Sequence, residues 1–537
     1  MKRSALSSGI KLSFLTFLSR ILGLVREMTK AAFLGTSDLA DAFGIAFMIP
    51  NLFRRLFAEN SISVAFIPVF KSYLEERAAE KDKTGGTEKA RDKELRLFLN
   101  SVFTLVSFFT ALTTVLGIIL IPYIAPLFIK DASQSIIPEM VFLTRLMFPY
   151  LAVISIAAFF QGILNSVKIF TPSGFTPVLF NIAVISAAYL LSPRTANPAR
   201  AMAYGVIAGG TIQALFQLPF VLKEGFRPAF TGLKCAFGNP GTKRVLKLIG
   251  PTVIGMAAYQ VNDVVSTALA GNAGSGIVSS LQYSLRLQEL ILGIFAVSVG
   301  TVILPDLAGL AKRKEYEAFE KMLSQAMHII ALITIPISFF LFVFGENLII
   351  LVYKTRRFSD ESVFLTLKAF RFHIAGLFFI ALNRIIAPAF YAQSDTKSPT
   401  IAGIGGFAVN ILLALILIRP MKGGGIALAL SLASFANTVI LFVFLNKSKT
   451  IHTGRLVRPY IAYALKLALF SLLCVLPLYM FKQQLFAPFA HLHRFFAQGI
   501  PLFTAALVFA FLGIGLLALT KDASLMSIVR HVRKQSD

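Results

Sequence analysis

Residues 496–520 read FAQGIPLFTAALVFAFLGIGLLALT, a stretch of 25 residues without one charged side chain. At about 1.5 Å per residue, a helix of this length crosses the roughly 30 Å hydrocarbon core of a bilayer. The whole chain of 537 residues has the same character, since 56% of it is apolar and only 15% is charged. Soluble domains contain about 25% charged residues. The composition therefore predicts an all-α polytopic membrane protein.

Apolar runs bounded by charges, glycine or proline predict about fourteen membrane-spanning helices. We expect them at 9–33, 42–70, 97–122, 137–165, 173–192, 199–222, 245–270, 277–310, 322–352, 362–391, 398–418, 424–446, 456–481 and 496–520. The first run resembles a signal peptide, but Arg20 and Arg26 interrupt it and no small-residue cleavage pattern follows. We therefore interpret it as a retained first span.

The net charge of +26 comes from 52 Lys and Arg residues against 26 Asp and Glu residues. Such a charge would indicate nucleic-acid binding in a polar protein, but here the charges lie between apolar runs and leave no solvated basic face. An even number of spans places both termini on one side, and roughly three in four of the basic residues outside the spans fall on that side. The positive-inside rule therefore predicts cytoplasmic termini, and the basic loops favour contact with anionic membrane lipids.

Two loops are the longest, at about 71–96 and 223–244, and neither is long enough for a catalytic domain. The first mixes both signs of charge and contains no GxxxxGK phosphate-binding loop, so we expect no ATPase in this chain. The second lies near the midpoint of the sequence. We expect an N-lobe in 1–222 (spans 1–6), a cytoplasmic linker in 223–244, a C-lobe in 245–446 (spans 7–12), and a C-terminal helix pair with a cytoplasmic tail in 447–537.

An internal repeat supports this division into two lobes. Lys168 and Asn181 have the same spacing as Lys397 and Asn410, at an offset of 229 residues. The segments AFIPVF (65–70) and VILPDL (302–307) lie 237 residues apart. Six spans separate the copies, so both copies have one orientation, as in the parallel repeats of alternating-access transporters. The pattern predicts two six-helix lobes around a central cavity.

Patterns of catalysis and metal binding are weak. Cys235 and Cys474 are far apart and form no CxxC motif. His491 and His493 form an HxH pair in an external loop without further ligands, so we expect no metal site. No arrangement of nucleophile and base predicts catalysis, and we therefore expect a protein that is not an enzyme and has no organic cofactor.

Arginines inside the first two predicted spans are the main functional signal. A charged side chain at the centre of a membrane helix costs about 2.5–3.5 kcal/mol on the insertion scale. Arg20, Arg26 and Arg54 occupy such positions, with Glu27 and Asp41 as the few nearby anions. Guanidinium groups bind phosphate bidentately and stay charged when water is removed. The pattern predicts a cationic cavity for a phosphate-bearing amphiphile.

Two further charge pairs and one proline accompany these arginines. Arg55 and Glu59 are four residues apart, and Arg286 and Glu289 are three apart, so each pair shares a helical face. Either pair could be an ion pair that merely joins helices, or could belong to a gate. Pro50 lies within 42–70, where it predicts a broken helix that frees backbone groups for a cavity.

Asp263 is the single carboxylate in the predicted span 245–270, next to Gln260 and Asn262. It is a candidate site for a coupling cation such as sodium, and the alternative is a hydrogen-bonded carboxylate at a helix contact. Four other basic residues receive no role from the sequence: Arg145, Lys368, Arg371 and Arg384.

Several segments resemble the MurJ/MviN family of lipid II flippases, within the multidrug/oligosaccharidyl-lipid/polysaccharide exporter superfamily. They are SRILGLVRE (19–27), ADAFGIAFMIPNLFRRLFAEN (40–60), AFIPVF (65–70), YSLRLQEL (283–290), VILP (302–305) and FYAQSDTKSPT (390–400). The similarity extends over essentially the whole chain, and its PNLFRRLFAE segment is long and specific.

The resemblance implies transport of undecaprenyl-pyrophosphate-linked peptidoglycan precursor, lipid II, from the cytoplasmic to the periplasmic leaflet of the bacterial inner membrane. It implies substrate-binding roles for Arg20, Arg26, Arg54 and Arg286, and acidic gate partners at Asp41, Glu59 and Glu289. It also implies that the last two spans form a groove for the lipid tail. Sodium or membrane-potential coupling occurs in the family but is not uniform, and other proteins of cell-wall synthesis are candidate partners.

One position departs from the family pattern, and rival functions remain open. Relatives carry an acidic residue before the arginine of the eighth span, where this chain has Leu285, so a gate that needs this carboxylate is in doubt. A cation-coupled multidrug exporter would be expected to centre its cavity on carboxylates and aromatic residues, and the arginines argue against it. A polysaccharide-lipid flippase would use similar cationic chemistry. A membrane glycosyltransferase would need a larger loop or cavity with catalytic carboxylates, and a scaffold would not need arginines in mid-span.

Overall fold

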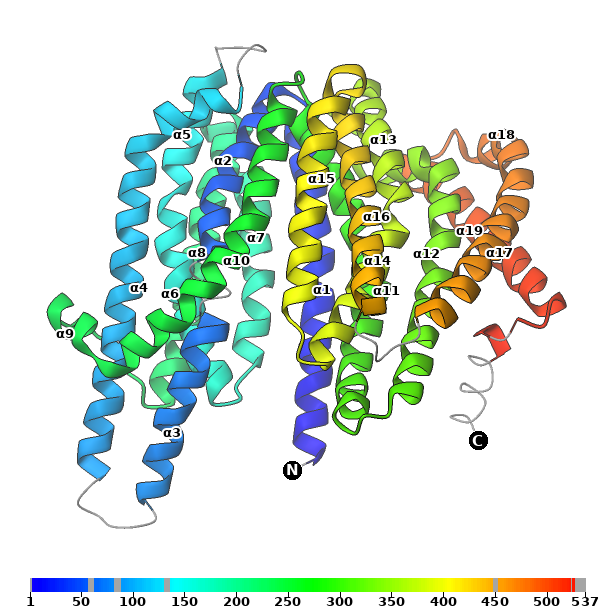
Figure 1. Cartoon of the computed structure of the whole chain (residues 1–537). Helices are drawn as coiled ribbons and strands as arrows, with labels where there is room; N and C mark the ends of the chain where they lie inside the picture. Colours follow the sequence, from blue (N-terminus) through cyan, green and yellow to red (C-terminus); the bar gives the residue numbers. More distant parts are fainter. Residues whose placement is uncertain are drawn as a thin grey trace. The chain divides into compact units, whose positions relative to one another are not determined.

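The computed structural model describes residues 2–56, 62–81, 88–129, 136–447, 453–522 and 524–526. Every regular element in these ranges is helical, and they contain no strand (Figure 1). The chain forms two compact units, Met1–Val278 and Ser279–Asp537, called unit 1 and unit 2 below. The all-α class predicted from the apolar runs is therefore confirmed. The lobe boundary expected in 223–244 stays a prediction.

Unit 1 contains the first ten helices and three short helical segments. They are α1 (Lys2–Leu34), α2 (Asp38–Arg54), the π-helical η2 (Ile62–Phe66), α3 (Ile67–Lys81), α4 (Glu88–Ile124), the 3-10 segment η3 (Ala125–Leu127), α5 (Ile137–Met147), α6 (Pro149–Ser166), α7 (Thr171–Leu191), the 3-10 segment η5 (Ser192–Arg194), α8 (Pro198–Lys223), α9 (Leu233–Gly238) and α10 (Pro240–Gly271). Fully buried phenylalanines form the centre of one core cluster, with Phe66 stacked on Phe70 and Phe98 and in contact with Phe159.

Unit 2 contains the remaining helices. They are α11 (Ile277–Lys312), α12 (Tyr316–Tyr353), α13 (Asp360–Ala375), α14 (Leu377–Ala392), α15 (Lys397–Met421), α16 (Gly423–Lys447), α17 (Thr453–Met480), α18 (Lys482–Phe486), the 3-10 segment η6 (Ala487–Phe489) and α19 (Arg494–Leu519). The last two long helices pack on α12 through an apolar cluster that includes Phe344, Cys474 and Phe509.

As far as the described ranges reach, all fourteen predicted spans fall on helices, either one helix or consecutive ones. Among the described residues, nine helical stretches are long and apolar enough to cross a membrane, and the pair α13–α14, bent by 43°, would be a tenth. The other predicted spans correspond to α1, α2 to α3, α10 and α11, which carry Arg20, Arg54, Asp263 and Arg286. The exact count of fourteen stays a prediction.

The prediction that Pro50 breaks its helix is wrong. Helix α2 continues through Pro50 to Arg54, and the proline itself is buried. A proline removes one backbone hydrogen bond and strains the preceding turn, but surrounding packing can maintain a helix through it. The regular α-helix instead ends four residues later, where a π-helical turn begins at Arg55.

Several helix starts follow directly from local sequence. Asn197 precedes Pro198, and its side-chain oxygen accepts a hydrogen bond from the Arg200 N–H at 3.0 Å. Asn239 and Pro240 repeat this arrangement at the start of α10. An asparagine cap satisfies backbone donors that the first turn leaves open, and proline at the first helical position loses no hydrogen bond.

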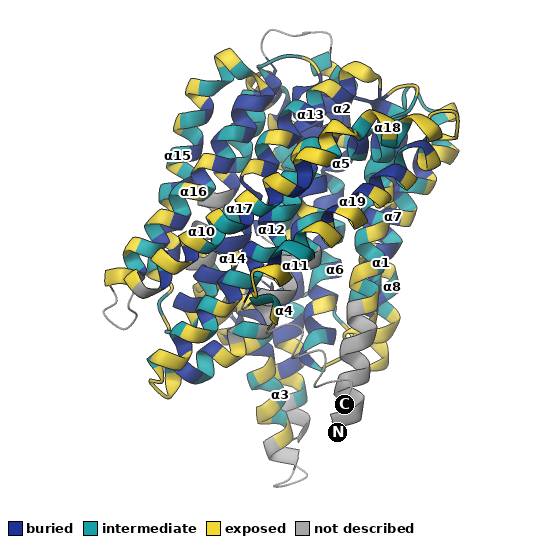
Figure 2. Ribbon diagram, turned by 90° about the vertical axis from the view of Figure 1, so that its right-hand side faces the viewer, coloured by how far each residue is buried: buried dark blue, intermediate teal, exposed yellow. Residues whose placement is uncertain are grey.

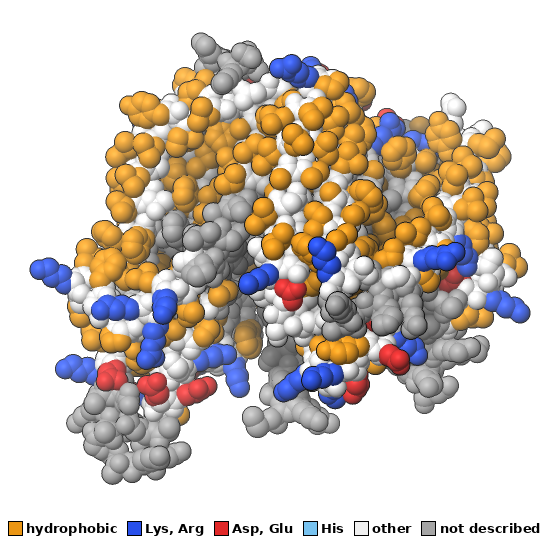
Figure 3. Space-filling model, viewed as in Figure 1, with side chains coloured by type: hydrophobic (Ala, Val, Ile, Leu, Met, Phe, Trp, Pro, Cys, Tyr) orange, Lys and Arg blue, Asp and Glu red, His pale blue; other side chains and the backbone are white. Residues whose placement is uncertain are grey.

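The outer surfaces of the helices are apolar, as a bilayer requires. Helix α15 exposes Ile401, Ile404 and Leu412, and α19 exposes Phe503 and Phe511. Figure 2 shows exposed positions distributed along the length of α15 and α16. Hydrophobic side chains cover most of the face drawn in Figure 3. A soluble protein would cluster these side chains inside, so the protein is a multi-pass membrane protein.

The packing of the two units carries a repeat that matches the sequence repeat. In unit 1, α8 packs against α5, α6 and α7; in unit 2, α16 packs against α13, α14 and α15. The repeated asparagines, Asn181 in α7 and Asn410 in α15, are both buried. The same order of helices and the same partners recur, as duplication predicts.

A polar cluster anchors the segment after the last helix. The buried carboxylate of Asp522 accepts hydrogen bonds from the Lys466 ammonium at 2.7 Å and from the Tyr463 hydroxyl at 3.3 Å. It also accepts from the backbone N–H groups of Ser524 and Leu525. Burial by itself would raise the pKa of Asp522, but the Lys466 ammonium and the two N–H groups outweigh it and lower the pKa.

Candidate functional site

The Arg26 side chain joins α1 to α7 inside unit 1. One guanidinium nitrogen donates to the Asn181 side-chain oxygen at 3.1 Å, and another contacts the Glu27 carboxylate at 2.9 Å. Asn181 in turn donates to the backbone oxygen of Ser19 at 3.2 Å. The guanidinium also lies 5.7 Å from the ring centre of Phe180. These contacts fix the position of the guanidinium. Only 20% of the Arg26 side chain is exposed, so the contacts form in surroundings of low dielectric constant.

Two more charges lie near this arginine and balance the cluster. Lys30 and Asp41 are both buried, and Lys30 is close enough to Glu27, Arg26 and Asp41 to interact with each electrostatically. The four side chains Arg26, Glu27, Lys30 and Asp41 have no net charge. The sequence analysis missed Lys30, although it lies one turn after Arg26 in the same apolar helix, a position that could have revealed it.

Arg20 and Arg54 differ in their surroundings. Arg20 is half-buried on α1, about 9 Å along the helix from Arg26, and forms no ion pair with any residue that the structure describes. Arg54 is half-buried at the end of α2, and its Nε donates to the Asn51 side-chain oxygen at 2.7 Å. That partner is a neutral amide, which helps to orient the guanidinium.

Arg55 pairs with Asp263, a partner 208 residues away on α10. The separation is 3.5 Å, and the two side chains are 40% and 42% exposed, so the pair is loose and partly solvated. The predicted alternative partner, Glu59, lies outside the described residues. The candidate cation site at Asp263 therefore has an arginine beside it, and its role stays a prediction.

The charge pair expected on α11 is present in unit 2. Arg286 contacts Glu289 at 3.3 Å, as the spacing of three residues predicts, with side chains 33% and 58% exposed. The turns around it are fixed to α13, because the Ser284 hydroxyl and the His373 Nδ1 are 2.6 Å apart and Gln288 bonds to the His373 carbonyl. This buried polar contact, which the sequence did not reveal, holds the helix that carries Arg286.

The four unassigned basic residues lie in separate surroundings. Arg145 is exposed and its Nε donates to the Ile118 carbonyl at 3.1 Å. The stem of Lys368 packs against Gly424, and Arg371 lies 5.8 Å from the Phe342 ring centre. Arg384 is exposed. None of these contacts resembles the buried cluster around Arg26.

Of the predicted site residues, Arg20, Arg26, Arg54, Asp41 and Asp263 belong to unit 1. Arg286 and Glu289 belong to unit 2. Their proposed shared role in one substrate site stays a prediction. Within the described ranges, no three His, Cys, Asp or Glu side chains lie close enough to hold a metal ion.

An all-α, multi-pass membrane protein with two helical units and charged spanning helices belongs to the class of multi-helix transporters, and solved structures agree. The fold matches a multidrug resistance MATE family transporter of the MOP superfamily in an inward-facing conformation. That likeness has a TM-score of 0.63 at 14% identity and covers 83% of this chain and 99% of that one. It matches a lipid II flippase MurJ in an inward closed conformation more closely, with a TM-score of 0.75 at 26% identity over 95% of this chain and 99% of that one.

Sequence comparison gives the family. The family model described as lipid II flippase MurJ matches residues 30–497. A probable lipid II flippase MurJ of Treponema pallidum (strain Nichols) is 45% identical over 534 residues, covering 99% of both chains. The lipid II flippase MurJ of Burkholderia cenocepacia is 31% identical over 442 residues, covering 82% of this chain and 83% of the relative. The chain belongs to the lipid II flippase MurJ family, as the motifs indicated.

Proposed function

We propose that this protein carries lipid II from the cytoplasmic to the periplasmic leaflet of a bacterial inner membrane, with both of its termini in the cytoplasm. Membership of the flippase family supports the substrate, and the excess of basic residues on the side of the termini supports the orientation. It acts as a transporter and not as an enzyme.

The observation that carries the proposal is the state of Arg20. A half-buried guanidinium on an apolar helix, without a counter-ion among the described residues, is costly unless a ligand neutralises it. Two phosphoryl oxygens of a pyrophosphate can accept parallel hydrogen bonds from the planar guanidinium. In this mechanism, the pyrophosphate contacts Arg20, Arg26, Arg54 and Arg286, while the polyprenyl chain stays in lipid along α17 and α19.

Arg26 takes part by exchanging partners. In the described structure its charge is met by Glu27 and its direction is set by Asn181. An arriving pyrophosphate replaces Glu27 at the guanidinium. Alternating access is then driven by the difference in the free energy with which the substrate binds the two conformations of the transporter. Arg286 and Glu289 do the same on α11, where the loose pair opens readily.

Resetting of the transporter is coupled to a cation or to the membrane potential. The potential supplies about 2.3 kcal/mol per charge per 100 mV. Asp263 is the candidate cation ligand, and its partly solvated pair with Arg55 leaves the carboxylate accessible to a competing cation. Replacing Asp263 with Asn should remove any sodium dependence of transport; unchanged sodium dependence would exclude this residue.

The test replaces Arg20 with Ala in cells depleted of the native protein, and leaflet-specific labelling then measures lipid II on each face. We expect accumulation in the cytoplasmic leaflet, with normal amounts of the variant in the membrane and normal lipid II synthesis. Arg145→Ala is the matched control, since it removes an exposed arginine that bonds only to a carbonyl. Normal flipping by Arg20→Ala would refute the anion role, and an unchanged leaflet distribution on complete depletion would refute lipid II as substrate.

A further inference from the structure

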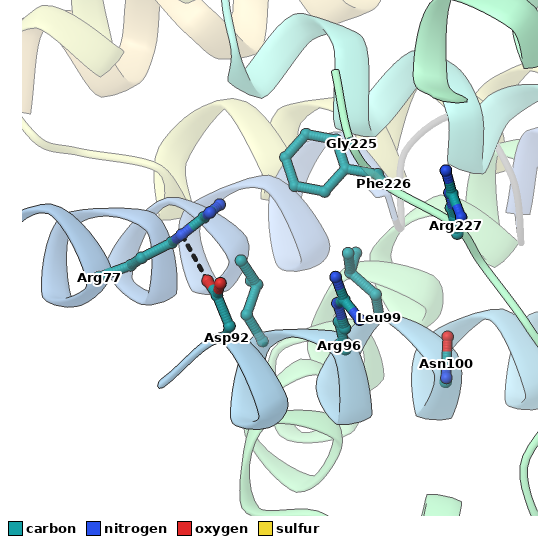
Figure 4. Close-up of a pocket in the computed structure, with 9 residues that line it drawn as sticks. Arg77, Asp92, Arg96, Leu99, Asn100, Gly225, Phe226 and Arg227 are labelled. Atoms are coloured by element: carbon teal, nitrogen blue, oxygen red, sulfur yellow. Dashed lines mark ion pairs between the residues drawn. The ribbon is translucent and has the colours of Figure 1, made fainter. Parts of the chain in front are cut away.

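A second cluster of arginines lies away from the proposed transport residues, in a pocket formed by α3, α4 and the segment that follows α8. Figure 4 shows Arg77 and Asp92 joined across the first two of these elements, with Arg96 and Arg227 further along the same side. The Arg77 Nε lies 2.7 Å from an Asp92 oxygen. Neither Arg96 nor Arg227 forms a hydrogen bond or ion pair with any other described residue, and both are exposed. The pocket therefore holds two guanidinium groups that have no counter-ion within the described part of the chain.

The pocket is built by specific contacts and does not depend on loose side chains alone. Gly225, with φ of +82°, turns the chain sharply after α8, a conformation that favours glycine. The chain then runs back along α4, where the Ala229 N–H donates to the Asn100 side chain and the Thr231 N–H donates to the Thr104 hydroxyl, each at 3.0 Å. These two acceptors are one helical turn apart. They fix the segment that carries Arg227 beside the helix that carries Arg96.

A buried aromatic side chain anchors the same segment. Phe226 is 7% exposed and meets Phe70 of the unit 1 core edge to face, with ring centres 5.5 Å apart. The residue next to it is Arg227, so the packing of Phe226 fixes the backbone position from which the Arg227 side chain extends. A rigid backbone lowers the entropic cost of ordering the two arginines around one ligand.

The pocket lies where two membrane-spanning stretches end. The apolar part of α4 begins directly after Arg96, and the spanning stretch of α8 ends at Lys223, two residues before Gly225. Exposed apolar side chains lie further along α4 toward the membrane: Phe230, 70% exposed, meets Phe103, and Phe237, 40% exposed, meets Phe109. Figure 3 shows Lys and Arg side chains gathered around the level of α9, below a face of hydrophobic side chains. Lipid phosphates occupy this depth of a bilayer.

We propose that this pocket binds the phosphate of an anionic phospholipid, with Arg96 and Arg227 on the phosphate oxygens and the acyl chains against the apolar surface of α4 and α9. The chemistry required is a negatively charged phosphate ester, whose oxygens accept hydrogen bonds from the two guanidinium groups. A free phosphate ion shares that chemistry but has no acyl chain for the exposed phenylalanines. This site is separate from the proposed transport of lipid II and does not depend on it.

Native mass spectrometry of the full-length protein, released from nanodiscs of phosphatidylcholine with phosphatidylglycerol, tests the proposal. The double variant Arg96→Ala with Arg227→Ala should retain phosphatidylglycerol roughly tenfold less than the original protein. The control Lys223→Ala with Lys234→Ala removes the same charge from exposed positions outside the pocket, and we expect less than about a twofold change. An equal loss in both double variants would show nonspecific attraction and overturn the proposal.

Two further measurements separate the remaining explanations. Asp92→Asn removes the single carboxylate among the lining residues and releases Arg77, so phosphatidylglycerol retention should rise by roughly threefold or more. Arg96→Lys with Arg227→Lys keeps the charge and should keep most of the phosphatidylglycerol retention. This variant distinguishes loss of the positive charge from a folding defect caused by replacing the two arginines. If inorganic phosphate added to the mixed phosphatidylcholine and phosphatidylglycerol nanodiscs abolished the preference for phosphatidylglycerol, the lipid assignment would be wrong.

Discussion

Asn181 offers a direct way to alter the charge at Arg26 without removing the arginine. Its amide oxygen accepts from the guanidinium at 3.1 Å, and aspartate has nearly the same shape. Asn181→Asp therefore places a carboxylate where the amide oxygen was. The balanced group of Arg26, Glu27, Lys30 and Asp41 then gains one negative charge.

Asn181→Asp should change the stability of the fold little and the transport of lipid II strongly. The new ion pair gains Coulomb energy but loses hydration, and the donor to Ser19 is lost, so the change in unfolding free energy should stay within about 1 kcal/mol. A phosphate on the other face of the guanidinium would lie about 6 Å from the new carboxylate, which gives a repulsion of about 3 kcal/mol at an effective dielectric of about 20. We expect lipid II flipping to fall roughly a hundredfold.

The assay compares leaflet-specific labelling of lipid II with the thermal stability of the purified protein. Asn181→Ala is the control, because it removes the same hydrogen bonds and adds no charge. We expect the Ala variant to flip within a few-fold of the original rate, since Glu27 still contacts Arg26. If the Asp and Ala variants flipped equally well at equal abundance, Arg26 would not bind the anionic part of the substrate.

Three other predictions follow from contacts in unit 2. Gly376→Ala should lower the free energy of unfolding by about 1–3 kcal/mol, because the added methyl carbon would lie 2.8 Å from the backbone of α16. Thermal unfolding measures this change. The control Gly403→Ala, which has open space around it, should show no loss of stability. Asp522 has a lowered folded pKa, so its stabilisation is complete above its unfolded pKa of about 3.9 and is lost as the pH falls through the lower folded value. Thermal unfolding between pH 2 and pH 6 should show this loss in the original protein but not in Asp522→Asn. Arg286→Ala should reduce flipping more than tenfold, whereas Glu289→Ala, which frees the guanidinium, should leave most of it; equal losses would indicate a structural pair.

The helices were predictable because their signal is local. Continuous apolar runs such as 496–520 lie within a single helix, and the spacing of Arg286 and Glu289 places them on one face of α11. Ends were less predictable, since α3 runs to Lys81 although the predicted span ended at 70. Charged residues extend a helix into water without an apolar signal, so hydropathy marks the membrane part and misses the rest.

The partners of the charges were not predictable, because they depend on packing between distant segments. The described structure pairs Arg55 with Asp263, 208 residues away, a contact that no local spacing indicates. Asn181 entered the sequence analysis only as a mark of the repeat, and its contact with Arg26 spans 155 residues. A single sequence contains no measure of such distances.

The contact between Arg26 and Asn181 also has a consequence for biosynthesis. Helix α1 is made before α7, and the polar partner of Arg26 follows 155 residues later. At roughly 5–20 residues per second, that interval lasts about 8–30 seconds. During this time Arg26 has Glu27 beside it on the same helix but lacks the amide that orients its guanidinium. The position of the Arg26 guanidinium is therefore fixed only when α7 has been made and packs against α1.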